Sequence, residues 1–600
     1  MHSFEVKENF YLDGKKIQII SGSIHYFRVV PEYWRDRLEK LKNMGCNTVE
    51  TYIPWNFHEA KKGEYIWDGR HDFEQFLNIA QELGLYAIVR PSPYICAEWE
   101  LGGLPAWLLA EPGMRLRCNY KPYLNHVTDY YSELIPKLVP HQIDHGGNII
   151  LIQIENEYGY FGNDKSYLEY LSRLLRKLGI TVPFVTSDGP WGAAFKTGQL
   201  NDVLPTGNFG SSCQKQFGVM KAQMKKEYPL MCMEFWAGWF DAWGNKFKRK
   251  SILKMNKTDF EYMVKDHNVN IYMFHGGTNF GFMNGSNYYA KLTPDTTTYD
   301  YDAPLAEDGR LTKKYNEFRK IIQKYHKVPD VKFSTKIKYK AFGKIEWQKC
   351  ADLFQNLEVM AQAKDSVFPL TMEEAGQNTG YILYRTHLQP DEKAYELIFE
   401  QCADRVQAFS NGNKLFTAFD KEICHEGHGI WPFNFTEGKK WKLKTQEGAC
   451  LDFLIENLGR VNFGHSLEDQ RKGIQKGVLI NGHRQFNWKH YCLSLDKEQI
   501  NSLNKNGIWQ NECSTQNPAF FIFQLTITEP ADTYLDFTGW GKGCIFINGF
   551  NLGRFWNKGP QKRLYIPAPL LQSGNNQIII FETEGKRGKS IEFFAEPKFS

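Results

Sequence analysis

The sequence has no apolar run close to the roughly 18 to 20 residues that a membrane-spanning helix needs, and its first residues, MHSFEVKENFYLDGKK, lack the apolar stretch of a secretion signal. Its 12 cysteines show no Cys-x-x-Cys spacing. Cys46, Cys232, Cys450 and Cys544 lie in apolar runs, which favours buried thiols over a disulfide framework. We therefore expect a soluble, cytoplasmic protein without membrane contact; export that needs no signal stays open.

Charge and length exclude further classes. With 73 Lys and Arg against 68 Asp and Glu, the net charge is only +5, and no long basic run predicts a nucleic-acid partner. The 600 residues exceed what one hydrophobic core holds, which predicts several domains. What the chain does have is a high aromatic content of 15%. Most of these rings belong in cores, and the rest are available to stack on apolar ligand faces.

Up to about residue 325, short β-rich runs alternate with amphipathic stretches such as PEYWRDRLEKLKNMG and HDFEQFLNIAQELG, each closed by a glycine typical of a helix C-cap. This alternation predicts parallel strands covered by helices, and eight such strands are what a closed (β/α)₈ TIM barrel requires. The candidate strands are residues 17–26, 46–55, 86–93, 148–157, 183–188, 205–210, 230–236 and 270–277.

Beyond about residue 335, runs such as GYILYRTHL, CLDFLIENLG, FFIFQLTI and NNQIIIFET are separated by Gly, Asn and Asp turns, with few helical windows. This pattern is typical of antiparallel β-sandwiches. We predict two of them, jelly-roll-like in architecture, divided near the polar stretch NSLNKNGIWQNE. The predicted division is a barrel at 1–325, a linker with connecting strands at 326–375, a first sandwich at 376–500 and a second at 501–600.

Polar residues at the carboxyl ends of the barrel strands carry most functional weight, because the active site of a TIM barrel forms there. A cleft lined by carboxylates and aromatic rings suits a neutral, polyhydroxylated ligand. The polar residues at or just past the candidate strands are His25, Glu50, Glu98, Glu157, Asp188, Glu234 and His275.

Two of these carboxylates stand out by their context. Glu157 in LIQIENEYGYFG ends the fourth strand and Glu234 in LMCMEFWAGWF ends the seventh, so the two are expected to face each other across the barrel mouth. Glycoside hydrolysis needs such a pair, one carboxyl protonated and one ionised. Asn156 and Glu157 both reach the cleft only if the strand is already bending into its loop. A helix cap or an ion pair is the alternative for each glutamate, and periodicity alone leaves that choice open.

Several long motifs resemble a known family. They are SGSIHYFR, NTVETYIPWNFHE, RPSPYICAEWELGGLPAWLL, QIENEYG, SDGPW, MEFWAGW, MFHGGTNFG and YDYDAPL in the barrel, and GYILYRT, LIENLGRVNFG and GWGKGCIFINGFNLGRFW beyond it. These runs are similar to glycoside hydrolase family 35, the β-galactosidases, in its bacterial type without a signal. The resemblance covers most of the chain and implies that the second sandwich is galactose-binding-like. It also implies a retaining exo-β-galactosidase acting on terminal β-galactosides of oligosaccharides.

The resemblance implies a role for individual residues. Glu157 matches the family's acid/base and Glu234 its nucleophile, with a covalent galactosyl-enzyme between the two steps. Glu98 is expected to accept two sugar hydroxyls, Asn156 to bind the 2-OH, and Tyr272 to donate to Glu234. The residues matched to galactose recognition are Tyr52, Cys96, Ala97, Glu98, Asn156, Tyr272 and Tyr301.

Departures from the family pattern concern the aglycone side. Trp236 stands where relatives can carry Tyr, and with Trp239 it predicts an aromatic wall at the +1 site. Phe463, in the VNFG loop of a β domain, completes that wall if the domain folds over the barrel mouth. A narrow site of this kind favours short β-linked disaccharide ends and suggests a preference for β-1,3 linkages.

The resemblance implies neither a metal nor an organic cofactor. The segment CHEGHG (424–429) lacks the His-Glu-x-x-His spacing of a zinc helix and is expected to form a loop. Asn256 and Asn434 match glycosylation acceptors but carry no meaning without a signal. Enzymes of this kind are often homodimers, though no interface can be identified from the sequence.

Two alternative functions stay open at this stage. A sibling exo-glycosidase with the same mechanism, such as a β-glucosidase or an exo-β-glucosaminidase, differs only in the sugar at −1. A catalytically inactive carbohydrate-binding protein with lectin-like β domains is the other alternative. The presence of Glu157, Glu234 and Asn156 argues against it.

Overall fold

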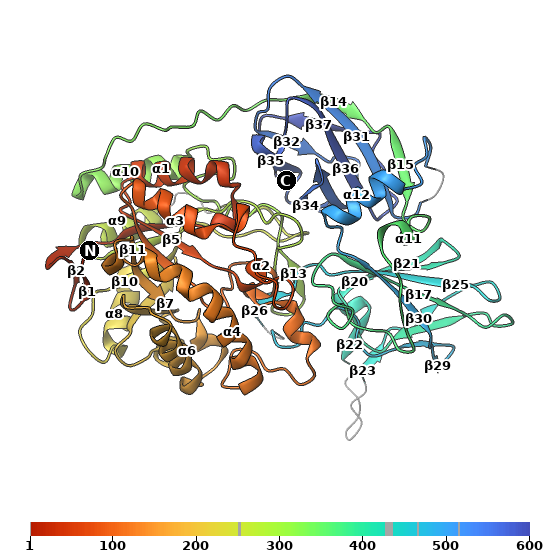
Figure 1. Cartoon of the computed structure of the whole chain (residues 1–600), viewed down its shortest axis with the longest axis horizontal. Helices are drawn as coiled ribbons and strands as arrows, with labels where there is room; N and C mark the ends of the chain where they lie inside the picture. The colour runs from red at the N-terminus through yellow and green to blue at the C-terminus, as the bar shows by residue number, and fades with distance from the viewer. Residues whose placement is uncertain (1, 250–253, 427–435, 465–466, 514–515) are drawn as a thin grey trace.

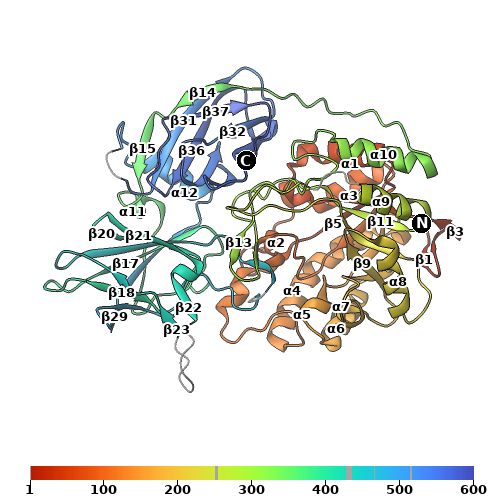
Figure 2. The ribbon, with the colours of Figure 1, turned by 180° about the vertical axis from the view of Figure 1, so that it is seen from behind.

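A computed structural model describes residues 2–249, 254–426, 436–464, 467–513 and 516–600. Figure 1 shows a barrel with two β domains beside it, and Figure 2 shows the same parts from behind. Asn434 and residues 427–429 of the CHEGHG segment lie outside the described residues. None of the helices in the described ranges is both long and apolar enough to cross a membrane.

The predicted barrel is confirmed, with all eight strands close to their expected positions. They are β4 (Ile20–Ile24), β5 (Thr48–Tyr52), β6 (Tyr86–Arg90), β7 (Ile149–Gln153), β8 (Phe184–Asp188), β9 (Leu204–Phe209), β10 (Met231–Trp236) and β11 (Asn268–His275). The strands are parallel and follow chain order around the barrel, which closes where β11 pairs with β4. An antiparallel sheet of β1 (Phe4–Val6), β2 (Phe10–Leu12) and β3 (Lys15–Ile17) precedes the barrel.

Helices cover the outside of the barrel, as the alternating pattern predicts. The two amphipathic stretches singled out in the sequence form α1 and α3, and the left-handed Gly45 (φ 110°) ends α1 by donating to Leu41. The side chain of Asp72 begins α3 by accepting from the backbone of Gln75 at 2.8 Å. The longer helices are α1 (Trp34–Met44), α3 (Phe73–Glu82), α4 (Lys121–Leu138), α6 (Lys165–Lys177), α8 (Cys213–Gln223), α9 (Lys254–Asp266) and α10 (Lys313–Tyr325).

The first all-β domain is an antiparallel sandwich, as predicted. Its larger sheet has the order β16-β30-β17-β25-β20-β21 and its smaller sheet the order β24-β18-β28-β29. The strands of the larger sheet are β16 (Lys364–Ser366), β17 (Tyr381–His387), β20 (Arg405–Ser410), β21 (Asn413–Phe419), β25 (Cys450–Glu456) and β30 (Trp488–Leu493). Those of the smaller sheet are β18 (Glu396–Phe399), β24 (Trp441–Lys442), β28 (Val478–Ile480) and β29 (His483–Arg484).

The second all-β domain has a sheet of order β15-β31-β36-β33-β34 and another of order β14-β37-β32-β35. Residues 326–342 lead in an extended course from α10 to this domain (Figure 1). The strands are β14 (Gly343–Glu346), β15 (Lys349–Asp352), β31 (Ala519–Ile527), β32 (Thr533–Asp536), β33 (Lys542–Ile547), β34 (Phe550–Trp556), β35 (Arg563–Ile566), β36 (Gly574–Glu582) and β37 (Ser590–Phe594).

The division of the chain is less sequential than predicted. Strands β14 and β15, placed in the linker at 326–375, belong to the two sheets of the last domain. The expected boundary at 500 falls inside helix α12 (Lys497–Asn506), because Ile500 and Leu503 bury one face of this polar stretch. The side chain of Asp496 caps the helix by accepting from Gln499 at 2.9 Å.

One small sheet connects the barrel mouth to the first all-β domain. The hairpin β12 (Ser286–Tyr288) and β13 (Leu292–Pro294) follows the last barrel strand, and β26 (Val461–Gly464) pairs with β12 in parallel. A segment from the β domain therefore lies at the carboxyl ends of the barrel strands.

Candidate active site

A pocket of about 280 Å³ opens at the carboxyl ends of the barrel strands. It brings together Glu157 and Glu234, which the sequence predicts as a pair. The other predicted site residues that line it are Cys96, Ala97, Glu98, Asn156, Trp236, Trp239, Tyr272, Tyr301 and Phe463. The ring of Tyr52 is fully buried, and its hydroxyl contacts two of these lining residues.

Glu157 lies where the chain leaves β7 and turns into the short helix α5 (Tyr158–Phe161). Glu155 and Glu157 both have left-handed backbones, with φ of 50° and 47°, so the strand has already ended. This explains how Asn156 and Glu157, adjacent in sequence, both reach the pocket. Arg117 fixes the turn by donating to both carboxylate oxygens of Glu155 at 2.9 Å and to the carbonyl of Asn156 at 2.7 Å.

The surroundings of Glu157 favour its protonated form. Burial and then the charge of Glu234 raise its pKa to about 8. The side-chain amide of Asn208, on β9, donates to Glu157 Oε1 at 3.0 Å and partly opposes this rise. A carboxyl that is neutral near pH 7 is able to donate a proton to a leaving group.

Three donors surround the carboxyl group of Glu234, near the end of β10. Arg90 Nη2 donates to Glu234 Oε1 at 2.7 Å, and the hydroxyl of Tyr52 lies 3.0 Å from the same oxygen. Trp236 Nε1 donates to Oε2 at 3.1 Å. These donors orient the carboxylate, and the Arg90 charge compensates for its burial.

The structure does not contain the hydrogen bond that we expected from Tyr272 to Glu234. The hydroxyl of Tyr272 lies 3.4 Å from that of Tyr299, and Tyr52 takes the place at Glu234. Tyr52 is able to do so because β5 and β6 are neighbours, and the Arg90 guanidinium lies over the Tyr52 ring at 4.0 Å. Two of the three donors to Glu234, Arg90 and Tyr52, therefore pack against each other.

The side-chain oxygen of Asn156 accepts hydrogen bonds from three neighbouring side chains. Its Oδ1 accepts from Arg90 Nη2 at 2.6 Å, Tyr52 Oη at 2.9 Å and Gln153 Nε2 at 3.1 Å. Because the oxygen already accepts from three donors, Nδ2 is the group that Asn156 can offer to a ligand in the pocket that it lines. The amide is thus oriented to donate to a ligand oxygen beside Glu234.

Glu98 ends a turn in which Cys96, Ala97 and Glu98 are all left-handed, with φ of 58°, 54° and 50°. The hydroxyl of Tyr299 donates to Glu98 Oε2. Burial raises the pKa of Glu98 to about 7, and the Tyr299 bond and the Arg28 charge oppose the rise. Such a run of strained residues persists only where its surroundings hold it, and it places a carboxylate at the pocket wall.

Aromatic rings line the pocket, among them the predicted Trp236, Trp239 and Phe463. Trp236 and Trp239 meet edge to face with ring centroids 5.5 Å apart. Phe463 comes from the first all-β domain, which does fold over the barrel mouth. The sequence interpretation missed four further aromatic residues that line the pocket, Tyr160, Trp191, Phe240 and Tyr289.

Four of the polar strand ends do not line the pocket. Glu50 points inward from β5, where Arg90 Nη1 lies 3.6 Å away. Asp188 accepts from the backbone of Gly159 at 2.8 Å and so fixes the loop after β7. His25 contacts Arg28 at 2.5 Å, and His275 is buried at the end of β11. A polar residue that ends a buried strand thus serves packing as readily as catalysis.

Arg90 and Asn208 are functional neighbours that the sequence interpretation missed. Each lies at the carboxyl end of its strand, β6 and β9, and contacts one of the paired carboxylates. The rule that selected the glutamates would have selected both, had it included residues other than acids and histidines. The same rule could not have selected Tyr299, because this residue lies on a loop after β11 and not at the end of a barrel strand.

A carboxyl that favours its protonated form and a second one held by cationic and neutral donors, together in a TIM-barrel pocket with aromatic walls, define a glycoside hydrolase. The model of glycosyl hydrolases family 35 matches residues 9–325. The chain belongs to this family. Models described as the first all-beta domain and the galactose-binding domain of beta-galactosidase match residues 369–494 and 518–576.

Curated relatives match along almost the whole chain. A human protein named beta-galactosidase-1-like protein 2 is 39% identical over 98% of this chain and 90% of its own length. The mouse beta-galactosidase is 37% identical over 96% of this chain and 91% of its own, and beta-galactosidase 8 of rice is 36% identical over 99% and 94%.

Proposed function

We propose that this protein is a retaining exo-β-galactosidase that releases terminal, non-reducing β-D-galactosyl residues from oligosaccharides. The observation that carries the proposal is the contrast between two carboxyls in one pocket: Glu157 has a pKa raised to about 8, whereas Arg90 and Tyr52 contact Glu234. The family and the names of the relatives support galactose as the sugar.

In the first step, Glu234 attacks C1 of the galactosyl residue while Glu157 gives its proton to the glycosidic oxygen. The C1–O bond breaks, the aglycone leaves as an alcohol, and an ester forms between C1 and Glu234. Retention requires the two carboxyls to stand roughly 5 to 5.5 Å apart on opposite faces of the sugar.

In the second step, a water gives its proton to Glu157 and attacks C1, so that galactose leaves and Glu234 becomes a carboxylate again. The charge of Glu234 is one cause of the raised pKa of Glu157. Ester formation removes that charge, so the pKa of Glu157 falls when it must act as a base. The same pair thus supports both proton transfers.

Galactose recognition in this proposal rests on polar groups at the pocket wall. The Asn156 amide donates to the 2-OH beside Glu234, a contact that strengthens in the transition state. The Glu98 carboxylate accepts sugar hydroxyls, which selects against an epimer that directs a hydroxyl elsewhere. The tryptophan wall with Phe463 holds the aglycone and, in this proposal, favours β-1,3 linkages.

Two finer parts of the proposal concern the cellular location and the assembly. The eleven cysteines whose side chains the structure describes are free thiols, most of them buried, which supports a reducing compartment such as the cytoplasm. A homodimer stays a prediction. Light scattering on the purified protein tests it, and a mass of one chain would contradict it.

Initial rates on unactivated disaccharides test the function. The panel is galactose linked β-1,3, β-1,4 and β-1,6 to N-acetylglucosamine, with cellobiose added, and the readout is released monosaccharide. We expect galactose from the galactosides, fastest from the β-1,3 isomer, and no glucose from cellobiose. Proton NMR of the first product anomer distinguishes retention from inversion, because a retaining enzyme releases β-galactose first.

The Glu234→Gln protein, prepared identically, controls for contaminating glycosidases. Release of glucose from cellobiose would indicate a β-glucosidase with the same mechanism instead. No release from any substrate would favour a carbohydrate-binding protein. If galactose is released and its α anomer forms first, the galactose specificity holds but the retaining mechanism is wrong.

A further inference from the structure

The first all-β domain enters the active site through one segment, residues 457–464, which follows β25. Its strand β26 pairs in parallel with β12, the strand that leaves the barrel mouth. Phe463 on this segment lines the pocket, and its neighbour Asn462 is fully buried. The segment therefore belongs structurally to the barrel mouth as much as to its own domain.

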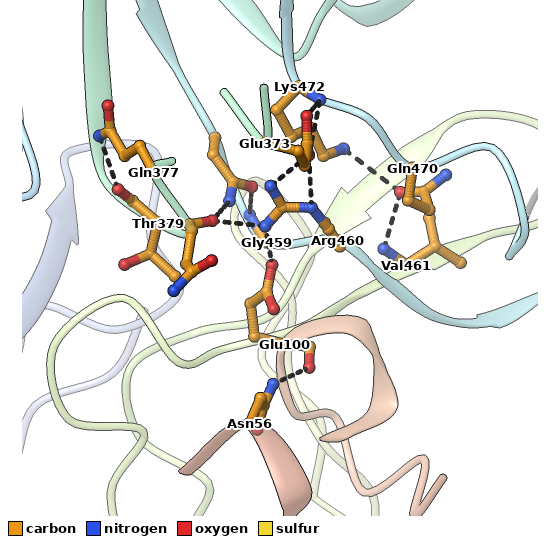
Figure 3. A network of polar contacts seen from close by, with 12 residues as sticks. Asn56, Glu100, Glu373, Gln377, Thr379, Gly459, Arg460, Val461, Gln470 and Lys472 are labelled. Atoms are coloured by element: carbon orange, nitrogen blue, oxygen red, sulfur yellow. Dashed lines mark hydrogen bonds and ion pairs between the residues drawn. The ribbon is translucent and has the colours of Figure 1, made fainter. Parts of the chain in front are cut away.

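A buried ion network fixes this segment in place (Figure 3). The Arg460 guanidinium donates to Glu100, on the barrel loop just past Glu98, and to Glu373 of the first all-β domain. The backbone carbonyl of Arg460 accepts from the amides of Leu101 and Ser286, which belong to the barrel. Because buried charges without partners are strongly unfavourable, breaking these contacts would be costly, and they anchor the segment to the barrel.

Asn462 contacts the galactose side of the pocket from this anchored position. Its Nδ2 lies 3.5 Å from Glu98 Oε1 and 3.6 Å from Cys96 Sγ. Its backbone carbonyl accepts from the hydroxyl of Tyr94, two residues before Cys96. One side chain thus meets both ends of the left-handed turn that carries the predicted galactose contacts.

We propose that Asn462 is a positioning residue for the galactose pocket, supplied by the first all-β domain and acting through Glu98 and Cys96. This inference rests on the proposed function. It makes the catalytic pocket a shared product of two domains, in which the barrel provides the reacting groups and the β domain fixes the sugar-binding turn.

The two donors to Glu98 divide its oxygens between them. Tyr299 donates to Oε2 and Asn462 to Oε1, so the plane of the carboxylate is set from both sides. A carboxylate accepts two sugar hydroxyls well only when its plane is fixed. Without Asn462, rotation about the terminal bond of Glu98 is restrained on one side only, and sugar affinity falls more than the rate of bond cleavage.

The first test is Asn462→Leu, which removes the amide at nearly constant volume. Galactose affinity, measured by calorimetry on the full-length protein, is expected to weaken at least about tenfold, the loss typical of one hydrogen bond to a charged group. KM for a galactoside rises in parallel, and kcat changes less.

The matched control is Asn356→Leu. Asn356 is equally buried and hydrogen-bonded at 2.7 Å to Asp352 and Ile508, and it does not line the pocket. It should lose stability but keep its galactose affinity.

The second test is Asn462→Asp, which keeps the shape and makes the donor depend on pH. While the introduced carboxyl and Glu98 share one proton, that proton replaces the amide hydrogen; when it leaves, two like charges face each other. The ratio of kcat/KM in this variant to that of the native protein should therefore fall as pH rises. A purely structural role gives no such pH-dependent rescue.

The outcomes separate this inference from the function on which it rests. If the native protein neither binds galactose nor cleaves galactosides, the proposed function fails. If the native protein is active and Asn462→Leu binds galactose as tightly as it does, the positioning role is overturned. A pH-independent ratio for Asn462→Asp overturns it as well, even where the leucine variant does not fold.

Discussion

Arg90 contacts Glu234 and Asn156 with one nitrogen, donating at 2.7 Å to Glu234 Oε1 and at 2.6 Å to Asn156 Oδ1. A buried guanidinium thereby couples the proposed nucleophile to the amide that is expected to hold the sugar 2-OH. Arg90 also donates through Nε to Gln153 Oε1 at 2.8 Å, and lysine cannot make both sets of contacts because its ammonium is a single point charge. The geometry of the site thus depends on the shape of Arg90 as well as on its charge.

Arg90→Lys should therefore lower kcat/KM by about a hundredfold, comparable to the loss of one preorganised donor. Steady-state kinetics on an aryl galactoside measures the effect. The control is Arg176→Lys, at an arginine that donates to the carbonyls of Ile180 and Val182 on the outside of the barrel. Equal activity of Arg90→Lys and the native protein would show that charge alone suffices.

The two glutamates are distinguishable by substitution. Glu234→Gln should abolish turnover while leaving galactose binding intact. Glu157→Gln should lose about 10² to 10⁴ in rate on disaccharides, the range for general acid catalysis, and far less on substrates whose leaving group needs no proton. Rates on a disaccharide and on a dinitrophenyl galactoside provide the comparison.

Azide rescue assigns the roles independently. Glu234→Gly with azide should give α-galactosyl azide, because azide then takes the nucleophile's place. Glu157→Gly with azide should give the β product, because azide attacks the covalent intermediate. If Glu234→Gly gave the β azide and Glu157→Gly the α azide, the roles of the two glutamates would be the reverse of those proposed.

The pH dependence follows from the raised pKa of Glu157. Its proton is present below a pKa of about 8 and is lost as pH rises through that value. We therefore expect kcat/KM on disaccharides to fall above about pH 8, and a pH–rate profile of the native enzyme measures this. In Glu157→Gln the alkaline limb should disappear, since the amide does not titrate there. If the variant keeps the alkaline limb of the pH–rate profile, that limb reports the titration of a group other than Glu157.

The barrel was predictable because its signal is local and repeated. Several strands begin with an apolar run, such as IILI in β7, and amphipathic helices such as α1, α3 and α6 alternate with the strands. Helix α12 was missed although Asp496 gives a cap signal and Ile500 and Leu503 give the spacing of a helix face. Only two apolar residues mark that face, so its polar composition resembled a linker.

The paired glutamates could be identified from their place at strand ends, but their hydrogen-bond partners could not. Tyr52 donates to Glu234 across 182 positions of sequence, and Asn462 reaches Glu98 across 364. Such contacts depend on how the barrel closes and how the β domain folds over it. No periodicity within a sequence window encodes them, which is also why the Tyr272 bond was assigned to the wrong partner.

Asn156 provides a test that depends on a single sugar hydroxyl. Its oxygen is occupied by Arg90, Tyr52 and Gln153, so removing the side chain as Asn156→Ala removes the donor to the 2-OH. We expect kcat/KM on a galactoside to fall about 10²- to 10³-fold, the cost of one transition-state donor. On the 2-deoxygalactoside, native protein and variant should differ little. An equal loss on both substrates would mean that the substitution disturbs Glu234 instead.

Phe463 tests whether the all-β domain contributes to linkage preference. Its ring borders the pocket with centroids 6.4 Å from Tyr160 and 6.1 Å from Tyr289, so Phe463→Ala opens the aromatic wall on one side. An aromatic contact beyond simple burial contributes about 0.5 to 1.5 kcal/mol, which corresponds to at most about tenfold in rate. We expect kcat/KM to fall by that factor on the preferred disaccharide and less on the other linkages, as measured with the three galactosyl disaccharides. Phe486→Ala is the matched control, because Phe486 is 42% exposed on the first all-β domain and does not line the pocket. A uniform loss over all three linkages would assign Phe463 to general binding, since selectivity requires that the ring contacts one aglycone orientation more closely than the others.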